Sequence, residues 1–222
     1  RKNMLKKYFK ALPLVSAVCL ASCCQPQQPP HICVMPLPVG FVPDSIVDDT
    51  LAASFSAKDF NWSDRSLTFT SYGETRYDTA LVNRLRKGDT IVYENKKMVI
   101  DTLVCKEGFI EINGGVEEGG MWLSDKAGGA WPGLRASGSY RATEMDDHSV
   151  YFPVGRVTIP LSDRFAISDC GDNPGDKQRI VDHGQKAYLY SLPDYKRDFS
   201  CLSTRVIIKD GKVETVIRHW IP

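Results

Sequence analysis

"TRVIIKDGKVETVIRHWI", residues 204–221, is the stretch that most directly predicts the fold. Two runs rich in valine and isoleucine flank the pair Asp210-Gly211. An Asp-Gly pair between two β-type runs is the strongest short-range signal for a two-residue hairpin, because both turn positions require positive φ. We therefore expect this part of the chain to form an antiparallel hairpin.

Working back from this hairpin, the chain beyond residue 44 carries the same kind of pattern. Short β-type runs separated by turn residues occupy 66–71, 90–94, 97–104, 109–113, 155–161, 164–168 and 186–192. Many short strands at close spacing are typical of a barrel or a sandwich. A parallel α/β fold is disfavoured because a series of crossover helices is missing. The sequence therefore predicts a mainly β protein, with a single antiparallel barrel or sandwich domain over 44–222.

One short helix is expected near 78–87. Asp78 can cap its first turn, and Gly88 can end it. Three apolar side chains would share its buried face: Ala80, Leu81 and Leu85.

The segment "LRKGDTIVYENKKMVIDTL", residues 85–103, resembles the first turn and curled hairpin of small SH3-like and OB-like barrels. The resemblance is loose and covers this segment alone. It favours a barrel, but it indicates no particular ligand, because such barrels carry unrelated functions.

The chain begins with a basic segment followed by an apolar one. Five basic side chains lie within the first ten positions: Arg1, Lys2, Lys6, Lys7 and Lys10. The apolar run over 11–21 is shorter than the roughly 20 residues that a membrane span needs. A basic head before a short apolar core is the layout of a secretory signal peptide, so we expect residues 1–22 to be a signal peptide.

The end of this run, Leu20-Ala21-Ser22-Cys23, resembles the lipobox of bacterial lipoproteins. The resemblance implies cleavage before Cys23 and a diacylglyceryl group on its sulfur, with a further acyl chain in many bacteria. Two or three acyl chains hold a protein stably at a membrane. Cys24 stands where an Asp would indicate inner-membrane retention in that family, which favours the outer membrane where one exists. The alternative is ordinary cleavage that releases a soluble protein.

Residues 23–43 are expected to form a tether behind the lipidated cysteine. Six of the 13 prolines lie within 24–43, and proline favours an extended, semi-rigid chain. Alternatively, the apolar residues of 32–42 pack on the domain as an edge segment, which would leave only 24–31 free.

Charge argues against nucleic acid as a partner. Removal of residues 1–22 takes away five of the 28 basic residues and none of the 27 acidic ones, which leaves a net charge of −4. Such a surface lacks the basic footprint of a nucleic-acid-binding domain. We expect no cofactor, and the expected partners are the membrane, through the lipid anchor, and an envelope glycan, peptide or protein.

The glycine-rich stretch 112–133 is the most unusual part of the domain. It carries Trp122 and Trp131, with Tyr140 just beyond, and aromatic side chains on loops can bind sugars or peptides. We expect Trp131 to be the exposed tryptophan of this ligand-binding rim. Two alternatives remain: these aromatic residues belong to the core, or the glycines bind phosphate, although the P-loop spacing is missing.

Five cysteines follow Cys23: Cys24, Cys33, Cys105, Cys170 and Cys201. An exported compartment permits disulfides. Cys170 and Cys201 lie in loop-like sequence and are the expected disulfide pair, whereas Cys105 ends an apolar strand and is expected to be a buried free thiol.

Other candidate sites are weaker. The acidic stretch 168–176 could hold calcium or form a solvated turn, and no metal site is expected. His148 lies beside Asp146 and Asp147, and His183 could act with Cys170 or Cys201, but only if the fold joins them.

These patterns predict an exported, membrane-anchored lipoprotein with a binding or structural role at the bacterial cell envelope, and no catalytic residue is assigned. The main alternative is an envelope hydrolase or transpeptidase with a Cys-His or Asp-His arrangement. A further alternative is strand addition by a partner at the hairpin edge of 204–221.

Overall fold

The computed structural model describes residues 28–37, 47–106, 108–125, 138–171, 173–181 and 183–221. Residues 31–222 form one compact unit. The predicted signal peptide, the predicted lipidation site Cys23 and Trp131 lie outside the described residues.

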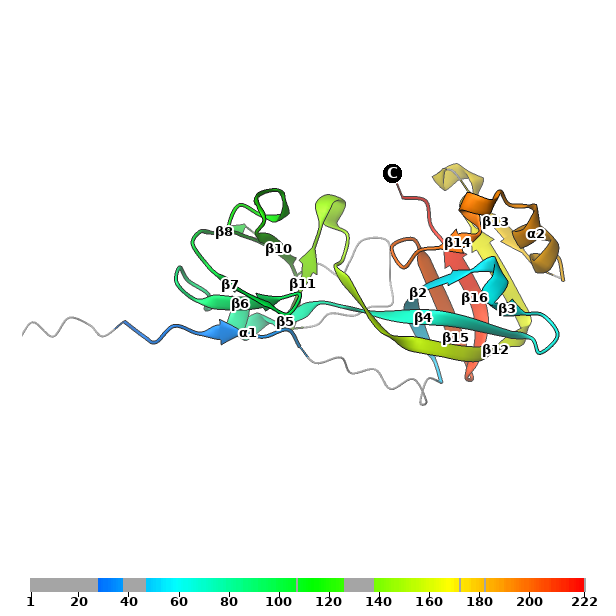
Figure 1. Cartoon of the computed structure of the whole chain (residues 1–222), viewed down its shortest axis with the longest axis horizontal. Coiled ribbons are helices and arrows are strands. Elements are labelled where there is room, and N and C mark those ends of the chain that lie inside the picture. Colours follow the sequence, from blue (N-terminus) through cyan, green and yellow to red (C-terminus); the bar gives the residue numbers. More distant parts are fainter. Residues whose placement is uncertain are drawn as a thin grey trace, which may run out of the picture. The chain divides into compact units, whose positions relative to one another are not determined.

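Five strands close into a barrel (Figure 1). They are β2 (Asp49–Ser56), β4 (Ser66–Glu74), β12 (Tyr151–Asp169), β15 (Thr204–Lys209) and β16 (Lys212–Arg218). Around the barrel the order is β2-β4-β12-β16-β15 and back to β2, and only the β12–β16 pairing is parallel. Numbered along the chain this is 1-2-3-5-4, the strand order of the OB fold, a five-stranded Greek-key barrel. The predicted mainly β fold is therefore confirmed.

Alternation along the strands builds the barrel core. In β4, Leu67, Phe69 and Ser71 are buried, while Thr68 and Thr70 between them are partly exposed. Side chains of a strand point to alternate faces, so one face fills the barrel. The C-terminal hairpin forms as predicted between β15 and β16, with positive φ at both turn residues, 50° at Asp210 and 69° at Gly211.

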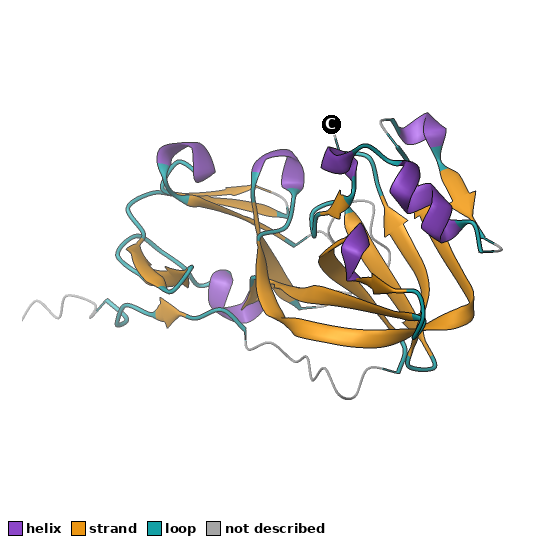
Figure 2. Cartoon of the chain, turned by 45° about the vertical axis from the view of Figure 1, so that its right-hand side comes forward, coloured by secondary structure: helices purple, strands orange, loops and turns teal. Residues whose placement is uncertain are grey.

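A second β region is inserted between β4 and β12 (Figure 2). Its five-stranded sheet contains β5 (Arg76–Asp78), β8 (Leu103–Lys106), β9 (Phe109–Ile112), β10 (Met121–Ser124) and β11 (Ser139–Thr143). A three-stranded sheet contains β1 (Cys33–Val34), β6 (Thr90–Tyr93) and β7 (Lys96–Val99). Buried residues of this insertion form a second hydrophobic cluster, separate from that of the barrel. The domain thus has two cores, because residues 75–150, together with Val34 of β1, bury their own apolar side chains.

Smaller elements complete the chain. They are the strands β3 (Phe60–Asn61), β13 (Gln178–Ile180) and β14 (Asp198–Phe199), the helices α1 (Thr79–Val82) and α2 (Gln185–Ser191), and the 3-10 segments Ala57–Asp59, Val116–Glu118, Met145–Asp147, Pro174–Asp176 and Asp194–Lys196.

The predicted helix near 78–87 is present but short. Asp78 caps α1 as expected, since its carboxylate accepts a hydrogen bond from the N–H of Leu81 at 3.0 Å. The buried side chains here are Val82 and Leu85, whereas Leu81 is 39% exposed. The expected burial of Leu85 is therefore confirmed, whereas the expected burial of Ala80 and Leu81 was wrong, because Val82 is the buried residue of α1.

The expected strand over 186–192 is wrong, because this segment forms α2. Gln185 and Leu189 are its buried residues, and a spacing of four places both on one helical face. Its two tyrosines gave the sequence a β-type character that packing overrides. The expected runs over 155–161 and 164–168 are parts of one strand, β12.

The first described segment packs on the insertion, as the second interpretation of the tether proposed. β1 pairs with β6, Val34 is fully buried, and the N–H of Leu37 donates to Arg76 O at 2.7 Å. His31 was expected to be free, yet its Nδ1 lies 3.2 Å from the buried carboxylate of Asp89.

Asp89 holds this segment in place. Its carboxylate accepts hydrogen bonds from the N–H groups of Ile32 and Arg86, each at 2.9 Å. Burial alone would raise the pKa of Asp89, but these hydrogen bonds and His31 outweigh burial and lower it. The compact part of the chain therefore begins at residue 31 rather than at 44.

Candidate functional site

A hollow of about 550 Å³ opens beside the barrel where β12, β13 and α2 meet the turn before β4. Its floor includes the buried side chains of Leu161, Phe165 and Gln185. We call it the first hollow. Its size lies within the range of small-molecule and oligomer-binding clefts, roughly 300–1,000 Å³.

An irregularity in β12 shapes this hollow. The register of β12 against β16 shifts between Leu161 and Ala166, and Asp163, Arg164 and Phe165 of the shifted stretch line the first hollow. Bulges of this kind redirect side chains and are common beside functional sites. Hydrogen bonds fix the stretch at both ends: Leu161 N–H donates to Arg65 O at 2.7 Å, and Gln185 Nε2 donates to Phe165 O at 2.7 Å.

Trp62 joins the first hollow to a second one. The second hollow, of about 600 Å³, lies over β3, β4 and β12, and both hollows share Trp62 and Lys186 as lining residues. The Trp62 ring is half-buried and stacks on the buried Phe60, with centroids 4.9 Å apart and planes at 11°. An aromatic ring braced on one side can act as a rigid contact surface on its exposed side.

Exposed cations surround the first hollow. They are Arg65, Arg164, Arg179 and Lys186, with His183 beside them. Among the described residues, Asp163 is the only acidic one that lines it, and Asp163 already pairs with Arg65 at 3.5 Å. Within the described part of the chain, Arg164, Arg179 and Lys186 have no ion-pair partner. The rim is therefore positively charged.

A buried ion pair between Arg218 and Asp169 contacts α2 through Tyr188. Arg218 donates from Nε to Asp169 Oδ1 at 3.0 Å and pairs with the second carboxylate oxygen through Nη2. Tyr188 of α2 donates its hydroxyl to the same carboxylate at 2.9 Å. Burial, together with this carboxylate, raises the pKa of Tyr188 to about 12.

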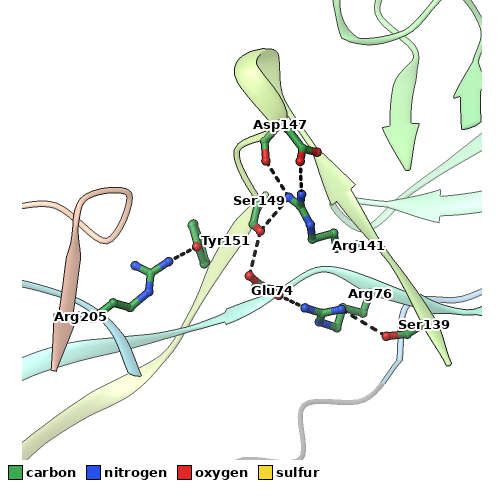
Figure 3. Close-up of polar contacts among 8 residues, drawn as sticks. All are labelled: Glu74, Arg76, Ser139, Arg141, Asp147, Ser149, Tyr151 and Arg205. Carbon is green, nitrogen blue, oxygen red and sulfur yellow. Dashed lines mark hydrogen bonds and ion pairs between the residues drawn. The ribbon is translucent and has the colours of Figure 1, made fainter. Parts of the chain in front are cut away.

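A second polar cluster lies where β4 and β12 leave the barrel (Figure 3). Glu74 pairs with Arg76 and accepts a hydrogen bond from Ser149 Oγ at 2.8 Å. Arg141, fully buried, donates to Ser149 Oγ at 3.1 Å and pairs with Asp147 at 2.6 Å.

Arg205 extends this cluster toward the barrel. It donates to the hydroxyl of Tyr151 and to the backbone oxygen of Cys201, the latter at 2.7 Å. Burial raises the pKa of Tyr151, against the opposing effect of Arg205, and burial lowers the pKa of Arg205. Apart from Asp147, whose side chain is 41% exposed, the groups of this cluster are buried or half-buried, and they bind one another. We therefore interpret the cluster as structural and the hollows as the candidate site.

Two of the three aromatic residues predicted for the rim, Trp122 and Tyr140, are described, whereas Trp131, the tryptophan expected to be exposed, lies outside the described residues. Tyr140 is buried in the second core, and its hydroxyl donates to Asn83 Oδ1 at 3.2 Å. Trp122 is half-buried in β10 and packs over Gly115, where an added Cβ would lie 1.8 Å from its Nε1. Exposure was wrongly expected for Tyr140, because β10 and β11 pair as regular strands despite the nearby glycines.

The predicted Cys170–Cys201 bridge is not formed, and both residues are free thiols. Cys170 follows β12 and Cys201 precedes β15, and β16 lies between these two strands. Two strand spacings amount to about 10 Å, beyond the roughly 7 Å between Cα atoms that a disulfide can bridge. Cys105 is a free thiol as expected, but it is exposed rather than buried, because β8 is the outer strand of its sheet.

The predicted acid-base pairs do not form around a cleft. Asp147 is bound by Arg141, and the half-buried His148 donates its backbone N–H to Met145 O. His183 lines the first hollow, whose lining contains no cysteine. Asp169, part of the possible calcium stretch, is held by Arg218. Among the described residues, no group of three or more His, Cys, Asp and Glu side chains is placed to hold a metal ion.

Strand addition at the C-terminal hairpin is also excluded by the structure. β15 pairs with β2 and β16, and β16 pairs with β15 and β12, so neither strand has an open edge.

No protein-family model matches the chain, and neither a curated protein nor a solved structure is significantly similar to it. Over the described ranges, no helix has the length and apolar character that a membrane span requires.

Sequence reasoning missed the residues of the two hollows. Trp62 stands in the polar turn "NWSDRS", residues 61–66, and an isolated tryptophan among turn residues was the one local signal for it. The cations come from separate stretches and show no shared motif.

Proposed function

We propose that this chain is an exported bacterial lipoprotein, anchored at the cell envelope through Cys23, whose barrel binds a ligand in the hollows on either side of Trp62. The observation that carries the binding role is the braced, half-buried Trp62 ring between two hollows with an uncompensated cationic rim. The proposed binding surface therefore lies on the barrel, and not on the aromatic rim that the sequence predicted.

The anchor rests on the sequence alone. The basic head, the apolar run and the residues Leu20-Ala21-Ser22-Cys23 support export and lipidation. By family analogy, Cys24 in the next position supports the outer membrane in a bacterium that has one. A Pro-rich stretch that ends at residue 30 would then separate the lipid from the compact part of the chain.

Binding is favoured over turnover by the composition of the hollows. Among the described lining residues there is no cysteine, and the two acidic ones, Asp59 and Asp163, pair with Arg156 and Arg65. Both carboxylates are therefore engaged by arginine, which disfavours them as general bases.

The anchor is tested by cell fractionation and by labelling with a fatty-acid probe. Cys23→Ala should move the protein to the soluble fraction and abolish labelling, whereas the matched control Cys24→Ala should change neither. A Cys23→Ala protein that remains labelled and membrane-bound contradicts the anchor.

The binding site is tested on an array of peptidoglycan fragments, neutral and acidic oligosaccharides, and peptides. Trp62→Ala should weaken the strongest interaction at least about fivefold, since loss of one stacked aromatic ring costs about 1–3 kcal/mol. Trp220→Ala, at a 40% exposed tryptophan that lines neither hollow, is the control. Equal binding by the wild type and Trp62→Ala to every array member refutes the site.

A further inference from the structure

We propose that the ligand of these hollows is an acidic glycan, a sugar chain with carboxylate or sulfate groups that crosses Trp62 and meets the cationic rim. This inference rests on the proposed binding site and specifies its ligand.

The charge of the rim is the first argument. Arg164, Arg179 and Lys186 line one hollow, are exposed, and have no ion-pair partner among the described residues. Like charges on one rim repel each other, and an anionic ligand would relieve that repulsion. Arg and Lys also donate charge-assisted hydrogen bonds to carboxylates and sulfates, which are stronger than neutral ones.

The placement of Trp62 is the second argument. Its ring is fixed against Phe60 and belongs to the lining of both hollows. A ligand that contacts the ring can therefore continue into a hollow on each side, which suits a chain of linked units better than one small molecule. The apolar C–H face of a sugar matches an indole ring, and a ring held in place before binding loses little entropy.

Lys186 places a positive charge beside Trp62 in both hollows. It lines both hollows together with Trp62, so a cation stands beside the aromatic ring where the chain would cross. In the second hollow, Lys58 adds another exposed cation, while Arg156 is paired with Asp59 at 2.6 Å. Positive charge thus continues along the whole proposed path.

Single-stranded nucleic acid is also a charged chain, but the hollows fit it less well. Nonspecific binding of single strands relies on several aromatic rings, on which successive bases stack. Among the described lining residues, Phe60 and Phe165 are only 6% and 5% exposed, which leaves Trp62 as the one Phe, Tyr or Trp ring available for stacking.

The experiment measures binding of the full-length chain, purified from membranes in detergent, to immobilised probes by biolayer interferometry. The acidic probes are an oligogalacturonate and a heparin oligosaccharide. The carboxyl-reduced oligogalacturonate has the same sugar backbone without charge, and an oligothymidylate represents nucleic acid.

At least one acidic probe should bind more than tenfold more tightly than the reduced probe. This affinity should fall as salt rises from about 0.05 M to about 0.5 M, because salt screens exposed charges. The variant Arg164→Ala/Lys186→Ala should lose about tenfold in affinity, since two exposed charge contacts contribute up to about 1 kcal/mol each. The matched control Arg84→Ala/Lys97→Ala removes one exposed arginine and one exposed lysine of the insertion and should bind like the wild type.

Three results overturn the inference: neither acidic probe exceeds the reduced probe, the oligothymidylate binds most tightly, or the two double variants lose affinity equally. The experiment also distinguishes an error in the ligand class from an error in the binding site. If the reduced probe binds and Trp62→Ala abolishes that binding, the acidic-glycan inference fails and the proposed site stands. If Trp62→Ala alters binding of no probe, the site fails as well. Because Arg164 and Lys186 are exposed, their substitution tests the inference even if Trp62→Ala unfolds.

Discussion

Glu74 is the best position at which to test the polar cluster that joins the barrel to the insertion. Its carboxylate pairs with Arg76 and accepts a hydrogen bond from Ser149, and its side chain is only 4% exposed (Figure 3). Glu74→Gln keeps the size and shape of the side chain and removes its charge. We expect this substitution to destabilise the fold, because the Arg76 guanidinium then faces a neutral amide in a site with little solvent.

The magnitude follows from the burial of the pair. Removal of one partner of a buried ion pair costs about 3–5 kcal/mol. Arg76 is 17% exposed and keeps a hydrogen bond to Ser139 Oγ at 3.3 Å, which places the expected loss near the lower limit, at about 3 kcal/mol. For a domain of this size, that corresponds to a fall in Tm of roughly 6–12 °C.

The assay is urea unfolding followed by circular dichroism and by tryptophan fluorescence. Both signals are needed, because a domain with two cores can unfold in two steps, and coincident transitions justify a single free energy. Asp163→Asn is the control, since Asp163 is 93% exposed in its pair with Arg65 and should lose at most about 1 kcal/mol. If Glu74→Gln loses no more free energy of unfolding than Asp163→Asn, the argument from burial is wrong.

Three further predictions concern stability. Because the pKa of Asp89 is lowered in the fold, its stabilising effect is complete above about pH 4 and is lost as pH falls through the native pKa. Asp89→Asn should therefore lower Tm relative to the wild type at neutral pH, and this difference in Tm should be smaller in acid. Gly115→Ala should lower the free energy of unfolding in urea by more than about 2 kcal/mol, since the strain of positive φ adds to the clash of the new Cβ with Trp122. Gly119→Ala, which also has positive φ but places its Cβ in open space, should lower this free energy by only about 1 kcal/mol. Because its pKa is raised to about 12, Tyr188 contributes stability below about pH 10 that is lost as pH rises toward 12. The Tm of Tyr188→Phe should therefore fall less than the Tm of the wild type between about pH 10 and about pH 12. An equal fall in Tm would contradict this role of Tyr188.

Local sequence patterns are sufficient to predict the local elements. The Asp210-Gly211 turn, the alternation in β4 and the cap at Asp78 depend on residues within a few positions of each other, so their physics can be followed along the chain. The predominance of β structure follows from the same patterns.

Contacts between distant segments decided the rest. The parallel pairing of β12 with β16 closes the barrel, and no local pattern specifies which strand lies beside which. Tyr140 is core because β10 and β11 pair, and α2 is helical because Gln185 and Leu189 face the barrel core. The two hollows arise in the same way: the turn at Trp62, the shifted stretch of β12 and the start of α2 lie apart in sequence. Only the tertiary fold brings the cations of these segments near Trp62, because the segments share no sequence motif that would predict their proximity.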